Sequence, residues 1–150
     1  MGEKVVATNR KARHEYFILE TYEAGIELRG SEIKSIRSGQ ISLGEAYVRI
    51  ENNQAWLVDS HVAPYEQANR FNHDPRRPRR LLLHSSEIRD LWNEVRQKGV
   101  TVVPLKVYLK DGRAKLEIGV AKGKKLYDKR ASIAERDARR EIDRELRRRD

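Results

Sequence analysis

The fold is decided by residues 100–120, which read VTVVPLKVYLKDGRAKLEIGV. Two runs of apolar and polar residues flank Asp111-Gly112, a dipeptide typical of a two-residue type I′ hairpin turn. A hairpin closed at that turn would pair apolar residues on one face: Leu109 with Ala114, Val107 with Leu116, Leu105 with Ile118 and Val103 with Val120. The other face would receive Tyr108 opposite Lys115 and Lys106 opposite Glu117. A slip of one residue would scatter this pattern, so the register is well specified.

A second hairpin is predicted upstream, with Asn52-Asn53 between Ala46–Glu51 and Gln54–Ser60. Asparagine tolerates the positive φ that such a turn needs. This hairpin would pair Val48 with Leu57 and Ile50 with Ala55. Shorter stretches with strand character are His14–Tyr22, Ile26–Leu28 and Arg80–Leu83.

Two helices are expected between the strands. Ser31 is a candidate cap for a helix over Glu32–Ser38 that Gly39 ends, and Ser85 for one over Ser86–Lys98 that Gly99 ends. Strands with small helices between them predict a mainly β protein, an OB-type closed antiparallel β-barrel. A split sheet with helices on one face is the alternative. The OB frame commonly binds single-stranded or irregular nucleic acid.

The charge balance points to an anionic partner. The 150 residues carry 32 Lys and Arg against 23 Asp and Glu, a net charge of +9, and 37% of residues are charged. Roughly 25% is usual for soluble domains, so the excess favours nucleic acid as the partner. The chain has no cysteine, which excludes disulfides, thiol nucleophiles and Cys-ligated zinc. No apolar run reaches membrane-spanning length, and we expect a cytoplasmic protein that does not contact membranes.

The charge density changes near Gly123. Residues 123–150 hold 11 basic and 7 acidic side chains but few large apolar ones, while residues 1–122 keep a net charge of +5. We therefore predict an OB-type RNA-binding body over 1–122 and a basic tail over 123–150. The tail has a capping box at Ser132–Glu135 and a helical row of arginines, Arg136, Arg140, Arg144 and Arg148. Such a helix is marginal alone and favourable beside a polyanion, although a lone solvated helix fits the composition equally well.

Three basic clusters are candidate phosphate contacts: Asn9–His14, His73–Arg80 and Lys122–Arg130. The first would be an arm, with Asn9, Lys11, Arg13 and His14 as its polar residues, or simply a solvated N-terminus. The second would be a stiff loop with four arginines, because Pro75 and Pro78 disfavour a helix, or a solubilising loop. In the third, glycine allows close approach to a phosphate and an aromatic residue can stack on a base.

Catalytic and metal-binding motifs are weak. The stretch Ser31-Glu32-Ile33-Lys34 matches the S-x-x-K pattern of acyl-serine enzymes, but Ser31 is already explained as a helix cap. No second histidine stands at ligand spacing from His73. We therefore expect no enzyme, no cofactor and no metal site.

Five sequence blocks in order resemble one known family. They are Asn9–Tyr16 (NRKARHEY), Glu23–Leu28 (EAGIEL), Gly30–Ser35 (GSEIKS), Asp74–Leu83 (DPRRPRRLLL) and Gly119–Arg130 (GVAKGKKLYDKR). They are similar to the SmpB family, the bacterial tmRNA-binding (SsrA-binding) proteins of trans-translation. The departures are mild, with Ile33 where valine is usual and Arg80 where lysine is usual.

The resemblance implies an OB-type barrel that binds the tRNA-like domain of tmRNA and delivers this RNA to stalled ribosomes. It implies that Glu23, Leu82 and Lys115 contact tmRNA, with the Asn9–His14 segment nearby. The residues implied at the ribosomal decoding region, beside small-subunit ribosomal RNA, are Gly123, Tyr127, Asp128, Lys129 and Arg130, to which we add Lys124 from the same cluster. The tail would become helical there, and the free protein would be a monomer.

Without the resemblance, the residues alone indicate a basic, strand-rich RNA binder. The alternatives are a general single-strand RNA-binding module or ribosomal protein of the OB type and, third, a small RNA-processing enzyme.

Overall fold

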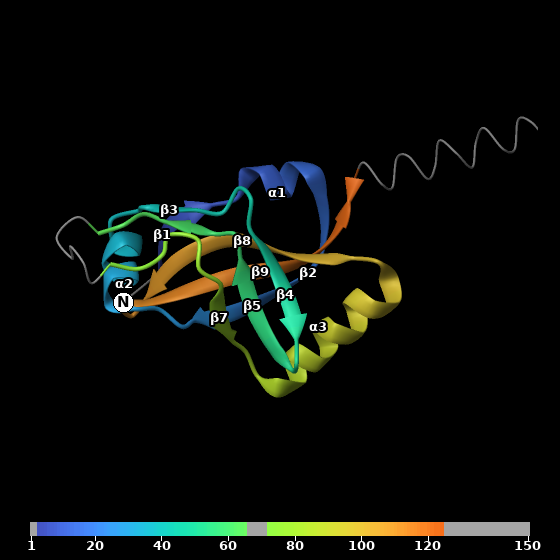
Figure 1. Ribbon diagram of the computed structural model, residues 1–150. Coiled ribbons are helices and arrows are strands. Elements are labelled where there is room, and N and C mark those ends of the chain that lie inside the picture. The colour runs from blue at the N-terminus through green and yellow to red at the C-terminus, as the bar shows by residue number, and fades with distance from the viewer. Residues whose placement is uncertain (1–2, 66–71, 125–150) are drawn as a thin grey trace, which may run out of the picture.

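The computed structural model describes residues 3–65 and 72–124 (Figure 1). In chain order, the elements are β1 (Glu3–Thr8), α1 (Arg10–Glu15), β2 (Tyr16–Ile26), α2 (Gly30–Arg37), β3 (Ile41–Ser42), β4 (Tyr47–Glu51), β5 (Gln54–Val58), β6 (His61–Val62), β7 (Arg79–Leu82), α3 (Ser85–Lys98), β8 (Thr101–Lys110) and β9 (Arg113–Gly123). No helix in these described ranges is long and apolar enough to span a membrane.

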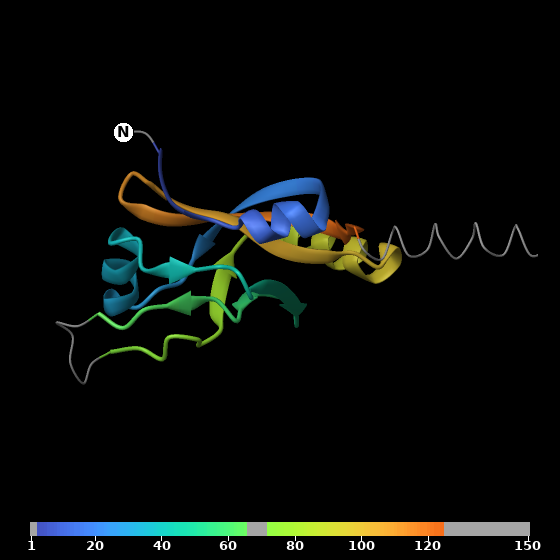
Figure 2. The same ribbon diagram turned by 90° about the horizontal axis from the view of Figure 1, so that it is seen from above.

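The main sheet closes on itself. Its strand order is β1-β8-β4-β5-β7-β2-β9, and β8 also pairs with β9, so the pairings form a ring with β1 added along β8. Each of these pairings is antiparallel. Two views at right angles place α2 and α3 at opposite ends of this ring (Figures 1 and 2). The prediction of a mainly β, OB-type fold with small helices is confirmed, and a split sheet is excluded.

The ring is filled by aliphatic side chains from every strand around it. Among those buried completely or almost so are Ala24, Leu57, Leu81, Val102, Leu116 and Ile118. Leu91 of α3 and Ile36 of α2 belong to the same cluster, so each helix closes one end of the core. Burial of this kind contributes roughly 25 cal/mol per Å² of apolar surface.

The hairpin of β8 and β9 follows the predicted register only near its turn. Leu109 pairs with Ala114, Val107 with Leu116, Tyr108 with Lys115 and Lys106 with Glu117, as expected. Farther along, the register shifts between Pro104 and Lys106, so Pro104 lies opposite Ile118 and Val102 opposite Val120. The predicted pairs Leu105–Ile118 and Val103–Val120 are therefore wrong.

The physical reason for the shift is a β-bulge beside a proline. Pro104 has no N–H to donate to the ladder, and prolines inside sheets are confined to such irregularities. The extra residue reverses the direction of the preceding side chains. Val103 and Leu105 consequently pack with Ala12 and Ala121 in a second apolar cluster under α1.

The N-terminal region differs most from the prediction. The expected arm at Asn9–His14 is the short helix α1, and the two strands expected at His14–Tyr22 and Ile26–Leu28 are one strand, β2, unbroken at Gly25. The cap explains the helix, because the Asn9 side chain accepts a hydrogen bond from the Ala12 N–H at 3.1 Å. Strand β1 was not predicted; it is largely exposed and is held by its pairing with β8.

The second hairpin is confirmed, with Asn52 and Asn53 at φ 51° and 59° and Val48 opposite Leu57. Both longer helices begin one or two residues before the predicted positions, and serine does not cap them. The carboxylates of Glu32 and Glu87 accept hydrogen bonds from the N–H groups of Arg29 and His84, at 2.8 and 3.1 Å. Gly39 and Gly99 have positive φ where the helices end, as expected.

Candidate RNA-binding surface

The three residues that the resemblance assigns to RNA lie together on the outside of the ring. Gly25 of β2 pairs with Leu82 of β7 on one side and with Lys115 of β9 on the other. Glu23 precedes Gly25 by two residues and therefore faces the same way. All of them line one hollow of about 560 Å³, which we call the central hollow. Its other lining residues include Gln54, Arg80, His84 and Glu87.

Gly25 forms the floor of the central hollow, a role that the sequence prediction missed. A Cβ atom added at Gly25 would lie 3.2 Å from the Cβ of Leu82, which is closer than nine in ten real contacts. The missing side chain lets Leu82 lie against the backbone of β2 while half of its surface stays exposed. An exposed leucine among charged groups suits contact with a base or a ribose face.

Glu23 is held by a partner from β8. The hydroxyl of Tyr108 donates to Glu23 Oε2 at 2.5 Å, and Lys110 Nζ lies 3.8 Å from the same oxygen. This hydrogen bond, with help from the charges of Lys110 and Lys115, holds the pKa of Glu23 below its ordinary value. Burial and the same hydrogen bond raise the pKa of Tyr108. Glu23 is thus an ionised acceptor, oriented beside the lysine at the edge of the hollow.

One basic residue of α1, Arg13, connects to this surface through Glu117. Arg13 Nη2 lies 3.2 Å from Glu117 Oε1, and Lys106 Nζ lies 3.6 Å from Oε2. Glu117 is paired with Glu23 across β9 and β2. Arg13 therefore borders the same outer face as the central hollow.

The other polar residues of that segment lie in different surroundings. Lys11 Nζ is 3.6 Å from Glu45 Oε1 in an exposed ion pair, and His14 is exposed. Asn9 is only 5% exposed, and its Nδ2 donates to the carbonyls of Leu43 and Pro104 at 3.2 and 2.9 Å. The side chain of Asn9 thus fixes the start of α1 against β8.

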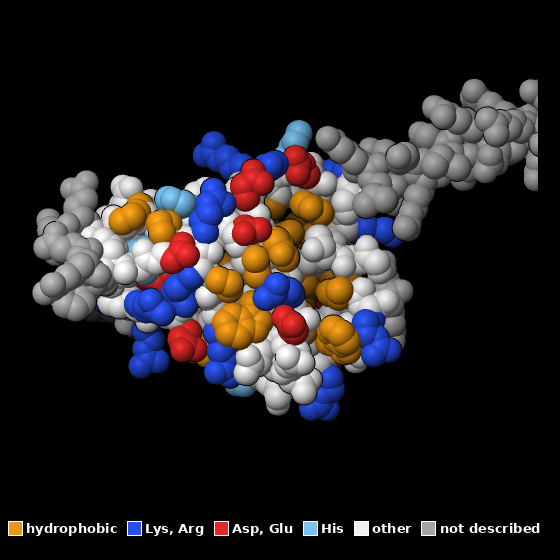
Figure 3. All heavy atoms as spheres, viewed as in Figure 1, with side chains coloured by type: hydrophobic (Ala, Val, Ile, Leu, Met, Phe, Trp, Pro, Cys, Tyr) orange, Lys and Arg blue, Asp and Glu red, His pale blue; other side chains and the backbone are white. Residues whose placement is uncertain are grey.

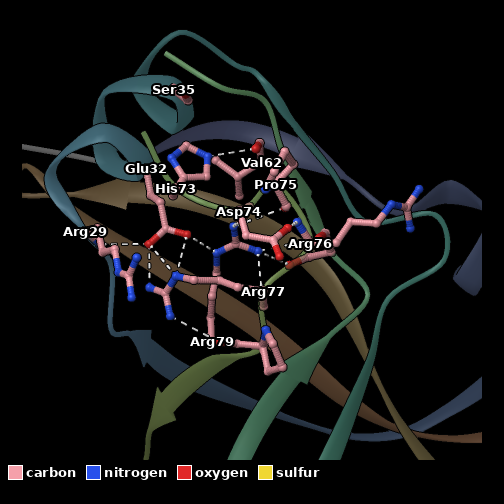
Figure 4. A network of polar contacts seen from close by, with 12 residues as sticks. Arg29, Glu32, Ser35, Val62, His73, Asp74, Pro75, Arg76, Arg77 and Arg79 are labelled. Atoms are coloured by element: carbon pink, nitrogen blue, oxygen red, sulfur yellow. Dashed lines mark hydrogen bonds and ion pairs between the residues drawn. The ribbon is translucent and has the colours of Figure 1, made fainter. Parts of the chain in front are cut away.

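The basic cluster His73–Arg80, which we call the arginine loop, is largely structural, contrary to the expectation of four phosphate donors. Arg77 and Arg79 both bind the carboxylate of Glu32, and Arg79 and Glu32 are fully buried (Figure 4). Arg77 Nε lies 3.1 and 3.0 Å from the two carboxylate oxygens, and Arg79 Nη1 also donates to Ser60 Oγ at 3.0 Å. Only Arg76 and Arg80 of the four are exposed.

The buried carboxylate stays charged because of these arginines. Burial alone would raise the pKa of Glu32, but the hydrogen bonds from Arg77 and the Arg29 N–H, with the charge of Arg79, hold it below the ordinary value. Glu32 comes from the S-x-x-K motif and lies 47 positions before Arg79. No local sequence signal could have joined them.

His73 also has a structural environment. Its Nε2 lies 2.9 Å from the Val62 carbonyl oxygen, and its Nδ1 lies 2.8 Å from Ser31 Oγ (Figure 4 shows the first contact). Ser31 is thus a partner of His73 rather than a helix cap. Within residues 3–65 and 72–124, no group of three or more His, Cys, Asp or Glu side chains could hold a metal ion.

We call the start of the tail, residues 123–130, the tail root. Its described residues, Gly123 and Lys124, lie at the far end of β9. Gly123 pairs with Tyr16, and Lys124 Nζ lies 5.2 Å from the centroid of the Phe17 ring. Lys115 and Gly123 are eight residues apart on one strand, roughly 27 Å at about 3.4 Å per residue. The remaining residues predicted for the decoding region and the tail helix lie outside the described residues: Tyr127, Asp128, Lys129, Arg130, Arg136, Arg140, Arg144 and Arg148.

Comparison with known proteins covers both the body and the tail. Residues 6–148 match the family model described as SmpB protein. The chain is 61% identical to the SsrA-binding protein of Desulforudis audaxviator over 97% of its length and 95% of the relative's. It is 63% identical to that of Roseiflexus castenholzii over 98% and 94% of the two lengths. A solved structure described as "tmRNA-SmpB: a journey to the center of the bacterial ribosome" is 50% identical, with a TM-score of 0.67 over 79% of this chain and 83% of that one.

Proposed function

The chain belongs to the SmpB family, and from this we propose that it is an RNA-binding adaptor of trans-translation. It binds the tRNA-like domain of tmRNA and delivers this RNA to stalled ribosomes, where the nascent peptide is tagged and the ribosome is rescued. The observation that carries the proposal is the register of β7, β2 and β9. That register gathers Glu23, Leu82 and Lys115 around one hollow in a chain that matches the family over residues 6–148.

The central hollow supplies three kinds of RNA contact. Lys115 and the exposed Arg80 are donors for phosphate oxygens. The ionised carboxylate of Glu23 accepts a hydrogen bond from an exocyclic amine, a ring N–H or a 2′-hydroxyl. The exposed face of Leu82 covers an apolar base or ribose surface. An RNA that satisfies all three presents a phosphate, a polar base edge or 2′-hydroxyl, and a base or ribose face at the same place.

In this proposal, ribosome binding takes place at the other end of β9. Gly123 and Lys124 lead into Tyr127, Asp128, Lys129 and Arg130, which contact the decoding region. The basic row Arg136, Arg140, Arg144 and Arg148 then forms a helix against ribosomal RNA. The body over 1–122 and the tail over 123–150 therefore hold different RNAs at the same time. The work is binding rather than catalysis, and its place is the cytoplasm.

Gel-shift titration of full-length tmRNA at several salt concentrations tests the proposal. Because the body neutralises several phosphates, log K falls linearly with log salt, and the slope becomes more negative with each phosphate contacted. An unstructured RNA of the same length serves as the matched competitor. We expect it to bind at least about tenfold more weakly, a difference of ~1.4 kcal/mol. Equal affinity for both RNAs would instead support a general single-strand RNA-binding protein, the alternative reading.

A further inference from the structure

A row of three side chains crosses the outside of β4, β5 and β7. Arg49 is paired with Trp56, and Trp56 is paired with Arg80. The neighbouring pairs Val48–Leu57 and Ala55–Leu81 are buried in the core, so the side chains of the row point outward. Arg49 and Arg80 are exposed, and Trp56 is partly exposed.

The geometry of the row resembles a base-stacking platform. Directly opposed side chains on adjacent strands have Cβ atoms about 4.5–5.5 Å apart, so one guanidinium group is rooted on each side of the indole. Arg49 Nε lies 3.2 Å from Glu51 Oε2 in a half-exposed pair, which leaves other donors of its guanidinium to face solvent. Figure 3 shows this face, where blue basic side chains border orange apolar ones over β4, β5 and β7.

The row is continuous with the central hollow. Arg80 and Gln54 line the hollow, and they neighbour Trp56 across β7 and along β5. An RNA seated on Glu23, Leu82 and Lys115 therefore reaches Arg80 first and Trp56 next. This continuity favours tmRNA as the occupant over a ribosomal RNA that approaches from the tail root.

We propose that Arg49, Trp56 and Arg80 form a second contact for tmRNA, at which an unpaired base stacks on Trp56 and the two arginines bind the flanking phosphates. The proposal rests on the tmRNA-binding function of the central hollow and extends it across β7. An indole offers its face to any unpaired base, and an arginine fork matches phosphate geometry. The competing explanation is that Trp56 only shields the sheet beneath the arginine stems.

The two tryptophans of the chain, Trp56 and Trp92, allow a direct optical test. Trp92 lies on α3, 42% exposed, with the Arg96 guanidinium 5.8 Å from its ring. In the W92F protein Trp56 is the only tryptophan, and in the W56F protein Trp92 is the only one, so tryptophan emission reports on one position in each. Saturating tmRNA should quench the tryptophan emission of the W92F protein, because a stacked base contacts the indole face. The emission of the W56F protein should change little.

Affinity gives the second readout. We expect W56A to weaken tmRNA binding by roughly 5- to 150-fold, the range for loss of one stacked base, and W56F to retain most of it because phenylalanine keeps a π-face. R49Q lies on the surface and should fold normally. It should weaken binding several-fold and lower the salt slope by about one contact. R96Q, an exposed arginine beside the other tryptophan, is the matched control and should bind like the wild type.

The outcomes separate this inference from the proposed function. If the wild type fails to bind tmRNA, the proposed function is wrong and this inference with it. If the wild type binds, but the W92F emission is constant and R49Q binds as tightly as R96Q, only the second contact is wrong. Quenching of the W92F protein by small ribosomal subunits without tmRNA would assign the platform to ribosomal RNA and overturn the choice of tmRNA.

Discussion

At the scale of single residues, the side chain that orients Glu23 was not among the residues that the family resemblance identifies. Tyr108 lies on β8 and is almost fully buried, yet its hydroxyl reaches Glu23 on β2. Lys106 Nζ lies 5.3 Å from the centroid of the Tyr108 ring. The sequence alone placed Tyr108 opposite Lys115, which is correct, but gave no sign that its hydroxyl holds the neighbouring carboxylate. That contact spans 85 positions and depends on the pairing of β2 with β9, the strand that lies between β2 and β8.

The first prediction concerns this hydroxyl. Replacement of Tyr108 by phenylalanine removes the hydrogen bond that lowers the pKa of Glu23, so this pKa should rise toward the ordinary glutamate value. A carbon-detected NMR titration of the Glu23 carboxyl in both proteins measures the change. We also expect Y108F to bind tmRNA more weakly than the wild type near pH 4, where more of its Glu23 is protonated, and almost normally at pH 8. An identical Glu23 pKa in the two proteins would contradict this assignment.

At the scale of elements, patterns local in the sequence were predictable and long-range ones were not. The turns at Asp111-Gly112 and Asn52-Asn53 need only their own residues, and both are confirmed. The bulge at Leu105 follows from Pro104 together with the packing of α1, which no alternation pattern contains. The sequence predicts two strands with Gly25 between them, whereas the structure has one strand, β2. Leu82 occupies the space that a side chain at Gly25 would fill.

The candidate site shows the same division. The resemblance identifies Glu23, Leu82 and Lys115. That they lie side by side is known only from the structure, in which Gly25 pairs with both Leu82 and Lys115. The sequence identifies the arginine loop as a cluster of basic residues. Its sequence cannot tell which of them turn inward, because the partner carboxylate lies on α2.

The second prediction concerns this link between α2, the arginine loop and β7. Replacement of Glu32 by glutamine removes the carboxylate that pairs directly with the buried Arg79. We expect the free energy of unfolding to fall by roughly 3–5 kcal/mol, measured by urea denaturation. The control is E45Q, which removes an exposed ion pair with Lys11 and should cost at most about 1 kcal/mol.

The pH dependence of the same link has a definite sign. The folded-state pKa of Glu32 lies below its ordinary value. Its carboxylate therefore stabilises the fold above a pH of about 4.3, and this contribution is lost as the pH falls through the folded-state pKa. The E32Q protein should lose less stability than the wild type over that interval. Parallel curves for the two proteins would show that the carboxylate is not the group that titrates.

At the scale of the whole molecule, we expect substitutions near the two ends of β9 to impair different activities. Joint replacement of Asp128, Lys129 and Arg130 by alanine leaves the central hollow and the hairpin pairs unchanged. We expect this variant to bind tmRNA with near-normal affinity and to tag few stalled peptides. Charge reversal in K115E should instead weaken tmRNA binding itself. Gel-shift and peptide-tagging assays on both variants measure the two losses, and a proportional loss of both activities in the triple variant would contradict the division.

The continuous strand β9 also has a consequence for how the family can vary. The hairpin of β8 and β9 pairs with β2, and the number of residues in β9 sets the distance between the two ends of this strand. In our proposal these two ends contact different RNAs. A residue inserted between Lys115 and Gly123 would turn every later side chain of β9 to the opposite face and lengthen the strand by about 3.4 Å. Residues added after Lys124 would do neither. We therefore expect an insertion after Lys124 to be tolerated better than one between Lys115 and Gly123.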